Sequence, residues 1–166
     1  MDRIYKPQRI LILGDTHRQD IIAQSVIEGE KPYDMMLHTG DAEGSEGILE
    51  RAAGVPCRFI SGNGDYTAYP YDDIFMIGPY RTMLTHGHTH RISAYGIDVF
   101  AEELAGKDIR ILIHGHTHVP RAEYHKGVLV LSPGSLAYPR QEGRKRTYMI
   151  LTMDAEGKLN YELKAL

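Results

Sequence analysis

Cysteine is nearly absent from this sequence of 166 residues, in which Cys57 stands alone. A single thiol cannot form an internal disulfide and cannot by itself build a thiolate metal site, so the sequence favours a reducing compartment. Long apolar runs are also missing. The first run covers only residues 10–13 before Asp15 interrupts it, which is too short for a signal or membrane-spanning segment. We therefore expect a cytoplasmic protein that does not associate with membranes.

An excess of one charge sign is lacking as well. Charged residues make up 25% of the chain and the formal net charge is −3, which describes an ordinary surface rather than a polybasic nucleic-acid binder or an acidic tail. No Pro/Ser-rich linker, internal repeat or low-complexity tract divides the chain. At this length, and with 42% hydrophobic residues, positions 1–166 are predicted to form one domain.

The alternation of short apolar runs with helix-like stretches predicts an α/β fold with a largely parallel sheet. Strands are expected at 9–14, 33–39, 55–61, 74–77, 80–85 and 109–114, and helices at 20–30, 45–53 and 97–105. Gly54 and Gly106 are predicted to end the last two helices. After Thr117 the strands become short, at 122–124, 128–131, 147–153 and 159–163, with hairpin signals at Lys126-Gly127 and Glu156-Gly157. This pattern predicts antiparallel pairing, and two sheets that meet face to face with helices outside.

Histidine, in contrast, is abundant, with nine in the chain. Five strand-like runs end alike, with glycine beside Asp, Asn or His. These ends are Gly14-Asp15-Thr16-His17, Gly40-Asp41, Gly62-Asn63, His86-Gly87-His88 and His114-Gly115-His116-Thr117-His118. Loops beyond the carboxyl ends of the strands share one rim of an open α/β sheet, and glycine allows a sharp turn and a close approach there. We expect these polar groups to converge.

Asp, His and Asn are the side chains that supply oxygen and imidazole ligands to divalent metals. The predicted ligands are Asp15, His17, Asp41, Asn63, His86, His116 and His118. They are too many for one ion that must leave a position open for substrate, so two ions about 3.5–4 Å apart are expected, bridged by a carboxylate and a water or hydroxide. Two carboxylates and a hydroxide leave about one positive charge, which attracts a phosphate anion.

This ordered set, Asp15-x-His17, Gly40-Asp41, Gly62-Asn63, His86 and Gly115-His116-x-His118, resembles the signature of the calcineurin-like metallophosphoesterase superfamily. The resemblance covers nearly the whole chain. The short length and the segment Ser132-Pro133-Gly134-Ser135 are similar to the small bacterial and archaeal phosphodiesterase branch. The resemblance implies a four-layer α/β/β/α sandwich of two mixed sheets, and two divalent ions, with manganese favoured over nickel, iron or zinc.

The resemblance also implies a role for each ligand. Asp15, His17 and His118 would hold the first ion, Asn63, His86 and His116 the second, and Asp41 would bridge them. A bridging hydroxide would attack phosphorus in line with the leaving group. The function it predicts is hydrolysis of a small or nucleotide-like phosphodiester, with Asp41 and Asn63 among the catalytic residues, to which we add His88 as a proton donor.

Gly64 departs from the family pattern, because most members have histidine after the asparagine and the small branch often has cysteine. Glycine cannot protonate a leaving group, and general-acid help is typically worth roughly 10²–10⁴-fold. Diesters and other substrates with good leaving groups are therefore favoured over monoesters. His88 or a metal-bound water is expected to donate the proton, and Asp65 is a weaker candidate because an ionised carboxylate repels the substrate.

Taken singly, the same residues have simpler interpretations. Asp15 or Thr16 could cap a helix, Asp41 could be a turn residue, and Asn63-Gly64 is a turn signal. Only the ordered set at successive strand ends favours a metal site.

The other histidines are interpreted from their neighbours. His86 is preferred to His88 as a ligand because it directly follows its strand. His38, inside an apolar run, is predicted to be a core residue or one that orients a metal ligand. His114 is predicted to be a structural residue, and His90 and His125 are predicted to lie on the surface.

The run Arg144-Lys145-Arg146 is predicted to be a solvated loop, with guidance of anionic substrates as the alternative. Arg140 is a candidate for reaching the phosphate rim. The eleven tyrosines are core or interface material, which leaves a homo-oligomer, dimer or tetramer, open.

Two other functions compete with the phosphodiesterase. The alternative is a non-catalytic protein-binding module that keeps the fold, as the related retromer subunit does, and Gly64 supports it. A full ligand set argues against it, because polar groups gathered on one rim cost stability if nothing binds them. A nuclease is disfavoured by the net charge of −3 and by the lack of room for a capping domain, so the expected partner is a small phosphodiester rather than nucleic acid.

Overall fold

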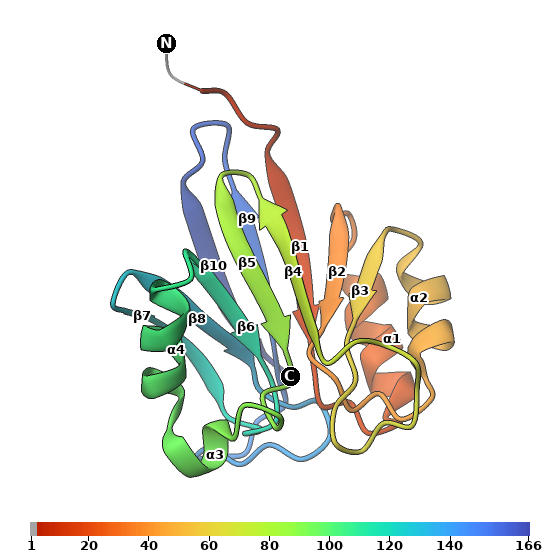
Figure 1. Ribbon diagram of the computed structural model, residues 1–166. Coiled ribbons are helices and arrows are strands. Elements are labelled where there is room, and N and C mark those ends of the chain that lie inside the picture. The colour runs from red at the N-terminus through yellow and green to blue at the C-terminus, as the bar shows by residue number, and fades with distance from the viewer. Residues whose placement is uncertain (1–2) are drawn as a thin grey trace.

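The structure is a computed structural model that describes residues 3–166. Two five-stranded sheets face each other, and helices cover their outer faces (Figure 1). The strand order is β10-β9-β1-β2-β3 in the first sheet and β4-β5-β6-β8-β7 in the second. Both sheets are mixed, as predicted.

The first sheet has a parallel half and an antiparallel half. β1 (Gln8–Leu13), β2 (Met35–His38) and β3 (Cys57–Phe59) run parallel, whereas β9 (Thr147–Met153) and β10 (Leu159–Ala165) are antiparallel to their neighbours. The carboxyl ends of the three parallel strands therefore meet at one edge of the sheet (Figure 1).

The second sheet repeats this arrangement. β5 (Tyr80–Thr85), β6 (Ile111–His114) and β8 (Val128–Pro133) are parallel, and β4 (Asp72–Ile77) and β7 (Pro120–His125) are antiparallel edge strands. The antiparallel pairing predicted after residue 117 is confirmed for β7 with β8 and for β9 with β10, but β8 also pairs in parallel with β6, which was not predicted. The hairpin at 126–127 does join β7 to β8, but β7 lies at the sheet edge, so the returning strand pairs with β6 in the same direction.

Four helices complete the two outer layers. α1 (Asp20–Gly29) and α2 (Glu46–Ala53) pack on the first sheet, and α3 (Ile92–Tyr95) and α4 (Ile97–Ala105) on the second. α2 ends at Gly54, which adopts the left-handed conformation with φ 66°. The single-turn helix α3 was not predicted, because four residues are too few to display helical periodicity.

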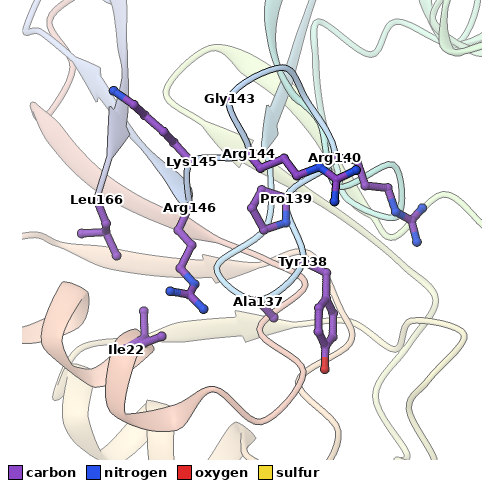
Figure 2. Close-up of a pocket in the computed structure, with 10 residues that line it drawn as sticks. All are labelled: Ile22, Ala137, Tyr138, Pro139, Arg140, Gly143, Arg144, Lys145, Arg146 and Leu166. Atoms are coloured by element: carbon purple, nitrogen blue, oxygen red, sulfur yellow. The ribbon is translucent and has the colours of Figure 1, made fainter.

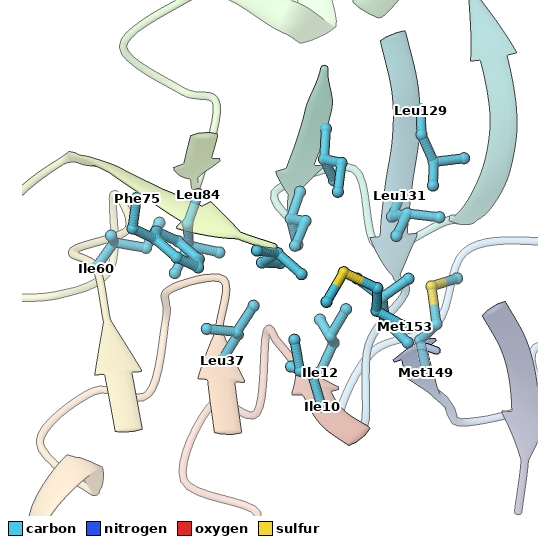
Figure 3. Packing of buried hydrophobic residues seen from close by; sticks show 14 residues of the cluster. Ile10, Ile12, Leu37, Ile60, Phe75, Leu84, Leu129, Leu131, Met149 and Met153 are labelled. Carbon is cyan, nitrogen blue, oxygen red and sulfur yellow. The ribbon is translucent and has the colours of Figure 1, made fainter. Parts of the chain in front are cut away.

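Alternation along β1 explains the four layers. Ile10 and Ile12 point into the apolar core between the two sheets, whereas Leu11 and Leu13 point to the layer beneath α1 and α2. Figure 3 shows Ile10, Ile12 and Leu37 from the first sheet opposite Leu84, Leu129 and Leu131 from the second. Because β1 is buried on both faces, its sequence reads as a continuous apolar run.

Three predicted strands are shorter than expected. The segments predicted at 33–39, 55–61 and 109–114 contain β2, β3 and β6, whose outermost predicted residues leave the sheet to form the adjoining loops. Within residues 3–166, no helix combines the length and apolar character that a membrane span requires.

A buried carboxylate ties the C-terminal end of α1 to the first sheet. Glu30 is 8% exposed, and it accepts hydrogen bonds from Tyr148 Oη, from Lys164 Nζ at 2.7 Å and from Arg9 Nη2 at 2.8 Å. Burial alone would raise the pKa of Glu30, but the bonds from Lys164, Tyr148 and Arg9 outweigh it and hold the pKa below 4.5. Ionised Glu30 therefore stabilises the fold.

We expect Glu30→Gln to lower the free energy of unfolding at pH 7 by about 2 kcal/mol, the usual worth of charged hydrogen bonds. Because the pKa of Glu30 is lower in the folded than in the unfolded chain, its contribution is complete above pH 4.5 and is lost as the pH falls through the folded value. Urea unfolding at pH 7 and pH 3.5 measures both effects. Glu28→Gln, an exposed site on the same helix, is the control, and an equal deficit of Glu30→Gln at both pH values contradicts the interpretation.

Candidate metal centre

The seven predicted ligands lie in the loops beyond the carboxyl ends of five strands. Asp15 and His17 follow β1, Asp41 follows β2, Asn63 follows β3, His86 follows β5, and His116 and His118 follow β6. The two sheets present these ends at the same edge of the sandwich (Figure 1). All seven side chains come together there.

The backbone in these loops adopts a conformation that side chains rarely take. Five of the seven residues have positive φ: Asp15 at 46°, His17 at 41°, Asp41 at 61°, His116 at 70° and His118 at 58°. Each such residue costs on the order of 1 kcal/mol, and clusters of them mark functional sites. Hydrogen bonds between loops hold the conformation, from Asp15 N to Gly40 O at 3.0 Å and from His17 N to Asp41 O at 2.9 Å.

One half of the centre is a compact group of four. Asp15, His17, Asp41 and His118 each offer a ligand atom, and these atoms lie within 4.8 Å of one another. His118 Nε2 is 3.2 Å from Asp15 Oδ1, and His17 Nε2 is 3.6 Å from Asp41 Oδ2. Within residues 3–166 this is the one such group of His, Cys, Asp or Glu side chains.

The other half is built around an amide oxygen. Asn63 Oδ1 lies 3.0 Å from His86 Nε2 and 3.1 Å from His116 Nδ1. His86 Nε2 is also 3.4 Å from Asp41 Oδ2, so this carboxylate contacts both halves. The arrangement agrees with the bridging position predicted for Asp41, and the ligand roles themselves stay predictions.

The outer nitrogens of three histidines are fixed by acceptors. Nδ1 donates to Thr39 O at 2.7 Å in His86 and to Tyr138 O at 2.8 Å in His118, and in His17 it bonds Glu43 Oε1 at 2.8 Å. Because Nδ1 carries a proton, Nε2 is the nitrogen that faces the centre, and its lone pair becomes available to a metal once Nε2 gives up its own proton. Sequence reasoning missed Glu43, although a carboxylate two residues after Asp41 was an available signal.

The centre attracts positive charge. Burial works against charged His86 and His118, but Asp41 and Asp15 outweigh it and raise the pKa of both imidazoles. Burial would also raise the pKa of Asp41, yet hydrogen bonds from His86 and from Gly64 N lower it to about 2. Both effects have the same origin, since buried carboxylates and imidazoles are in contact.

One buried carboxylate oxygen of the centre lacks a hydrogen-bond partner and supports a potential site for a divalent metal. Asp15 Oδ1 is buried and has no hydrogen-bond partner within residues 3–166, although His118 Nε2 lies 3.2 Å away. An unsatisfied buried carboxylate oxygen is costly, and a cation among the imidazole Nε2 atoms would satisfy it. The donor set of carboxylate, amide and imidazole suits manganese, iron, nickel or zinc.

Two histidines behind the centre are core residues. His38 and His114 are fully buried, and burial lowers the pKa of each to about 4, so both are neutral. His38 Nδ1 accepts from Gly40 N at 3.1 Å, and its Nε2 bonds Thr16 Oγ1 at 3.0 Å, which fixes the loops that carry Asp15 and Asp41. The predictions of a core or orienting role for His38 and a structural role for His114 agree with these positions.

The two candidate proton donors, His88 and Asp65, differ in the hydrogen bonds that their side chains make. His88 is half-buried, its ring centroid lies 5.3 Å from that of His86, and its Nδ1 has no partner within residues 3–166. The carboxylate of Asp65 instead accepts from the amides of Asp41, Glu43 and Gly62, each at 2.7 Å. Asp65 therefore shapes the loops, and because its oxygens already accept these hydrogen bonds it stays the weaker candidate for the proton donor.

His90 and His125, the two histidines predicted to lie on the surface, are partly exposed to a similar degree, 26% and 29%. His90 stacks on Phe100 with ring centroids 4.3 Å apart, and bonds Asp72 at 2.9 and 3.0 Å. The aromatic partner comes from α4, which is why local sequence did not reveal it. His125 lies on edge strand β7, and Arg140 reaches the centre through its backbone, whose amide donates to His118 O at 3.1 Å.

Comparisons with known proteins agree on a family. Residues 9–156 match the family described as the calcineurin-like phosphoesterase superfamily domain. A probable metallophosphoesterase of Bacillus subtilis is 33% identical over 149 residues, which cover 87% of this chain and 84% of that protein.

Solved structures share the fold at lower identity. An archaeal phosphodiesterase has a TM-score of 0.75 and 22% identity, with 95% of this chain and 99% of that chain covered. Vps29 from Entamoeba histolytica in complex with zinc has a TM-score of 0.72 and 21% identity, with coverage of 95% and 98%.

The close approach of two loops at Gly62 is the most sensitive point of the centre. A Cβ atom there would lie 2.1 Å from Asp41 Oδ1 and 2.8 Å from Asp41 N. We expect Gly62→Ala to cost about 1–3 kcal/mol by overpacking and to lower the melting temperature by about 2–4 °C per kcal/mol. Gly29→Ala, where a Cβ meets nothing within 4 Å, is the matched control. Equal melting temperatures for the two variants in thermal denaturation would show that Asp41 is not tightly confined.

Proposed function

This chain belongs to the calcineurin-like phosphoesterase superfamily, and we propose that it is a divalent-metal-dependent phosphodiesterase whose whole length, residues 1–166, forms one catalytic domain. The proposed substrate is a small or nucleotide-like phosphodiester. The observation that carries the proposal is the pair of buried carboxylates, Asp15 and Asp41, whose oxygens face imidazole nitrogens across the shared edge of the two sheets.

We propose two ions, with manganese favoured. Asp15, His17 and His118 would hold the first, and Asn63, His86 and His116 the second. Asp41 would hold both, which is supported by the separations of its Oδ2 from His17 Nε2, 3.6 Å, and from His86 Nε2, 3.4 Å. When bound, such ions lower the pKa of a shared water and stabilise charge on the phosphoryl oxygens.

The residues of the chain prepare this chemistry by fixing geometry and charge. Thr39 O and Tyr138 O hold the rings of His86 and His118 so that Nε2 faces inward. The low pKa of Asp41 keeps its carboxylate ionised at neutral pH. Preorganised groups of this kind need no rearrangement as charge develops on phosphorus.

Gly64 and Glu43 favour a diester over a monoester. A Cβ on Gly64 would lie 2.9 Å from Glu43 Oε1, so a carboxylate stands where a side chain at position 64 would begin. A monoester dianion carries one more negative charge than a diester and is repelled more strongly by Glu43. His88 is the proposed donor to the leaving group, because its half-buried ring lies beside that of His86, with the ring centroids 5.3 Å apart.

The second candidate is a protein-binding module. It is favoured by the likeness of the fold to Vps29 and by the lack of an acid at Gly64. Against it stands the cost of an unsatisfied Asp15 Oδ1 in a centre that binds nothing.

Metal removal and addition test the main proposal. Protein stripped with chelator and reloaded with Mn²⁺, Ni²⁺, Zn²⁺ or Mg²⁺ is expected to hydrolyse bis(4-nitrophenyl) phosphate faster than 4-nitrophenyl phosphate. Asp41→Asn should reduce kcat by more than about 100-fold, because even residues that only orient a ligand are worth 10–100-fold. His125→Gln, on β7 and remote from the centre, is the control. Faster turnover of the monoester would contradict the argument from Gly64, and no turnover with any metal would favour the binding module.

Glu43 supplies a separate test of the metal site itself. Its carboxylate bonds His17 Nδ1 at 2.8 Å and should raise the basicity of Nε2. Glu43→Gln is expected to weaken Mn²⁺ binding by about 10–100-fold in a calorimetric titration. Glu102→Gln makes the same charge change on the exposed side of α4. If both variants bind Mn²⁺ equally well, His17 is not a ligand or does not depend on Glu43.

A further inference from the structure

A basic cavity lies beside the proposed metal centre. It has a volume of about 950 Å³ and is formed by the loop between β8 and β9 together with Ile22 of α1 and Leu166 (Figure 2). Four of its lining residues are cations, Arg140, Arg144, Lys145 and Arg146, and no aspartate or glutamate lines it. In a chain with net charge −3, all the charged side chains that line this cavity are therefore cationic.

The four cations are available to a ligand. None of them forms an ion pair with another residue within positions 3–166, whereas Arg9, Arg58 and Arg121 are all paired. In Figure 2, Arg146 lies on the side of Ile22 and Leu166, and Arg140 lies on the side of Tyr138. Arginine forks bind phosphate oxygens in pairs, so these positions suit an extended anion.

The cavity and the metal centre share Tyr138. Its ring centroid lies 5.2 Å from that of His17, and its ring is nearly parallel to that of His118 at 6.5 Å. The same stretch of backbone is bound to His118 on both sides, since Tyr138 O accepts from Nδ1 and Arg140 N donates to His118 O. A ligand in the cavity therefore lies next to the ligands of the first proposed ion.

The loop is held in place from beneath. Ser135 Oγ accepts from Ala137 N at 3.0 Å and from Tyr138 N at 2.9 Å, and it donates to Asp15 O at 2.7 Å. Gln141 Nε2 donates to Lys145 O at 2.7 Å. Because these bonds order the backbone before any ligand arrives, little conformational entropy of the loop is lost on binding.

We propose that this cavity binds a second phosphate group of the substrate, remote from the phosphorus that is cleaved. The inference rests on the proposed phosphodiesterase function and narrows its substrate to diesters that carry an additional phosphate, as nucleotide-like molecules do. The exposed ring of Tyr138, next to His17, offers a surface for the part that joins the two phosphates. The cations of the loop attract the second phosphate. Because that phosphate is joined to the reacting one, its binding positions the reacting phosphate.

The first experiment measures binding without metal or turnover. Inorganic tripolyphosphate is titrated calorimetrically into chelator-treated protein. Arg144→Gln/Arg146→Gln is expected to bind it at least about tenfold more weakly than the unaltered chain, and Arg51→Gln/Arg91→Gln, which removes the same charge from exposed sites elsewhere, is expected to bind it like the unaltered chain. Equal weakening in both double variants would mean that net charge, not the cavity, attracts the anion, and would overturn the proposal.

The second experiment separates this inference from the proposed function. The metal-loaded variants are compared on bis(4-nitrophenyl) phosphate and on a 4-nitrophenyl diester of a nucleoside bisphosphate. Arg144→Gln/Arg146→Gln should raise KM for the bisphosphate at least about ten times more than for the simple diester. An equal change for both substrates overturns the cavity as a phosphate site while leaving the phosphodiesterase intact. If the cavity binds tripolyphosphate but neither substrate is hydrolysed, the proposed phosphodiesterase function is refuted and the cavity stands as a phosphate site.

Discussion

Confinement of two carboxylates, Asp15 and Asp41, beside imidazoles is the interaction on which the rest of this structure depends. Both are almost fully buried, and one oxygen of Asp15 lacks a partner within residues 3–166. A carboxylate charge that is buried away from water is costly unless a positive charge lies close by. In the protein alone, the carboxylates favour the protonated imidazoles and so raise the pKa values of His86 and His118. A pair of divalent cations would neutralise the carboxylates more completely.

The fold bears the cost of this confinement. Strained backbone at five of the proposed ligand positions is unfavourable in isolation, and so is the packing of loops so closely that Gly62 has no room for a Cβ. They persist because the strands that carry them are anchored in the core between the sheets, where Ile12 and Leu37 face Leu84 and Ile113. Neutral His38 ties the loops to this core, because it is hydrogen-bonded to Thr16 and Gly40.

His17 connects two chemically different neighbourhoods of the centre. Its Nδ1 contacts the Glu43 carboxylate, next to Gly64, and its ring contacts Tyr138, which borders the basic cavity. An acidic neighbour discourages a doubly charged reacting phosphate, while the cations of the loop attract charge elsewhere on the substrate. Together these two features support the proposal that the substrate is a singly charged diester within a larger, more negative molecule.

The sequence by itself determined the layers and the site edge. The apolar runs that precede Asp15, Asp41, Asn63, His86 and His116 require buried strands, and the polar residue after each run must then lie at the common edge. Only the tertiary structure decided the pairing of β8 with β6, the stacking of His90 on Phe100, and the contacts of Glu43 and Tyr138 with His17. Periodicity records which face of a strand or helix is apolar, whereas these contacts join segments whose approach depends on how complete layers pack.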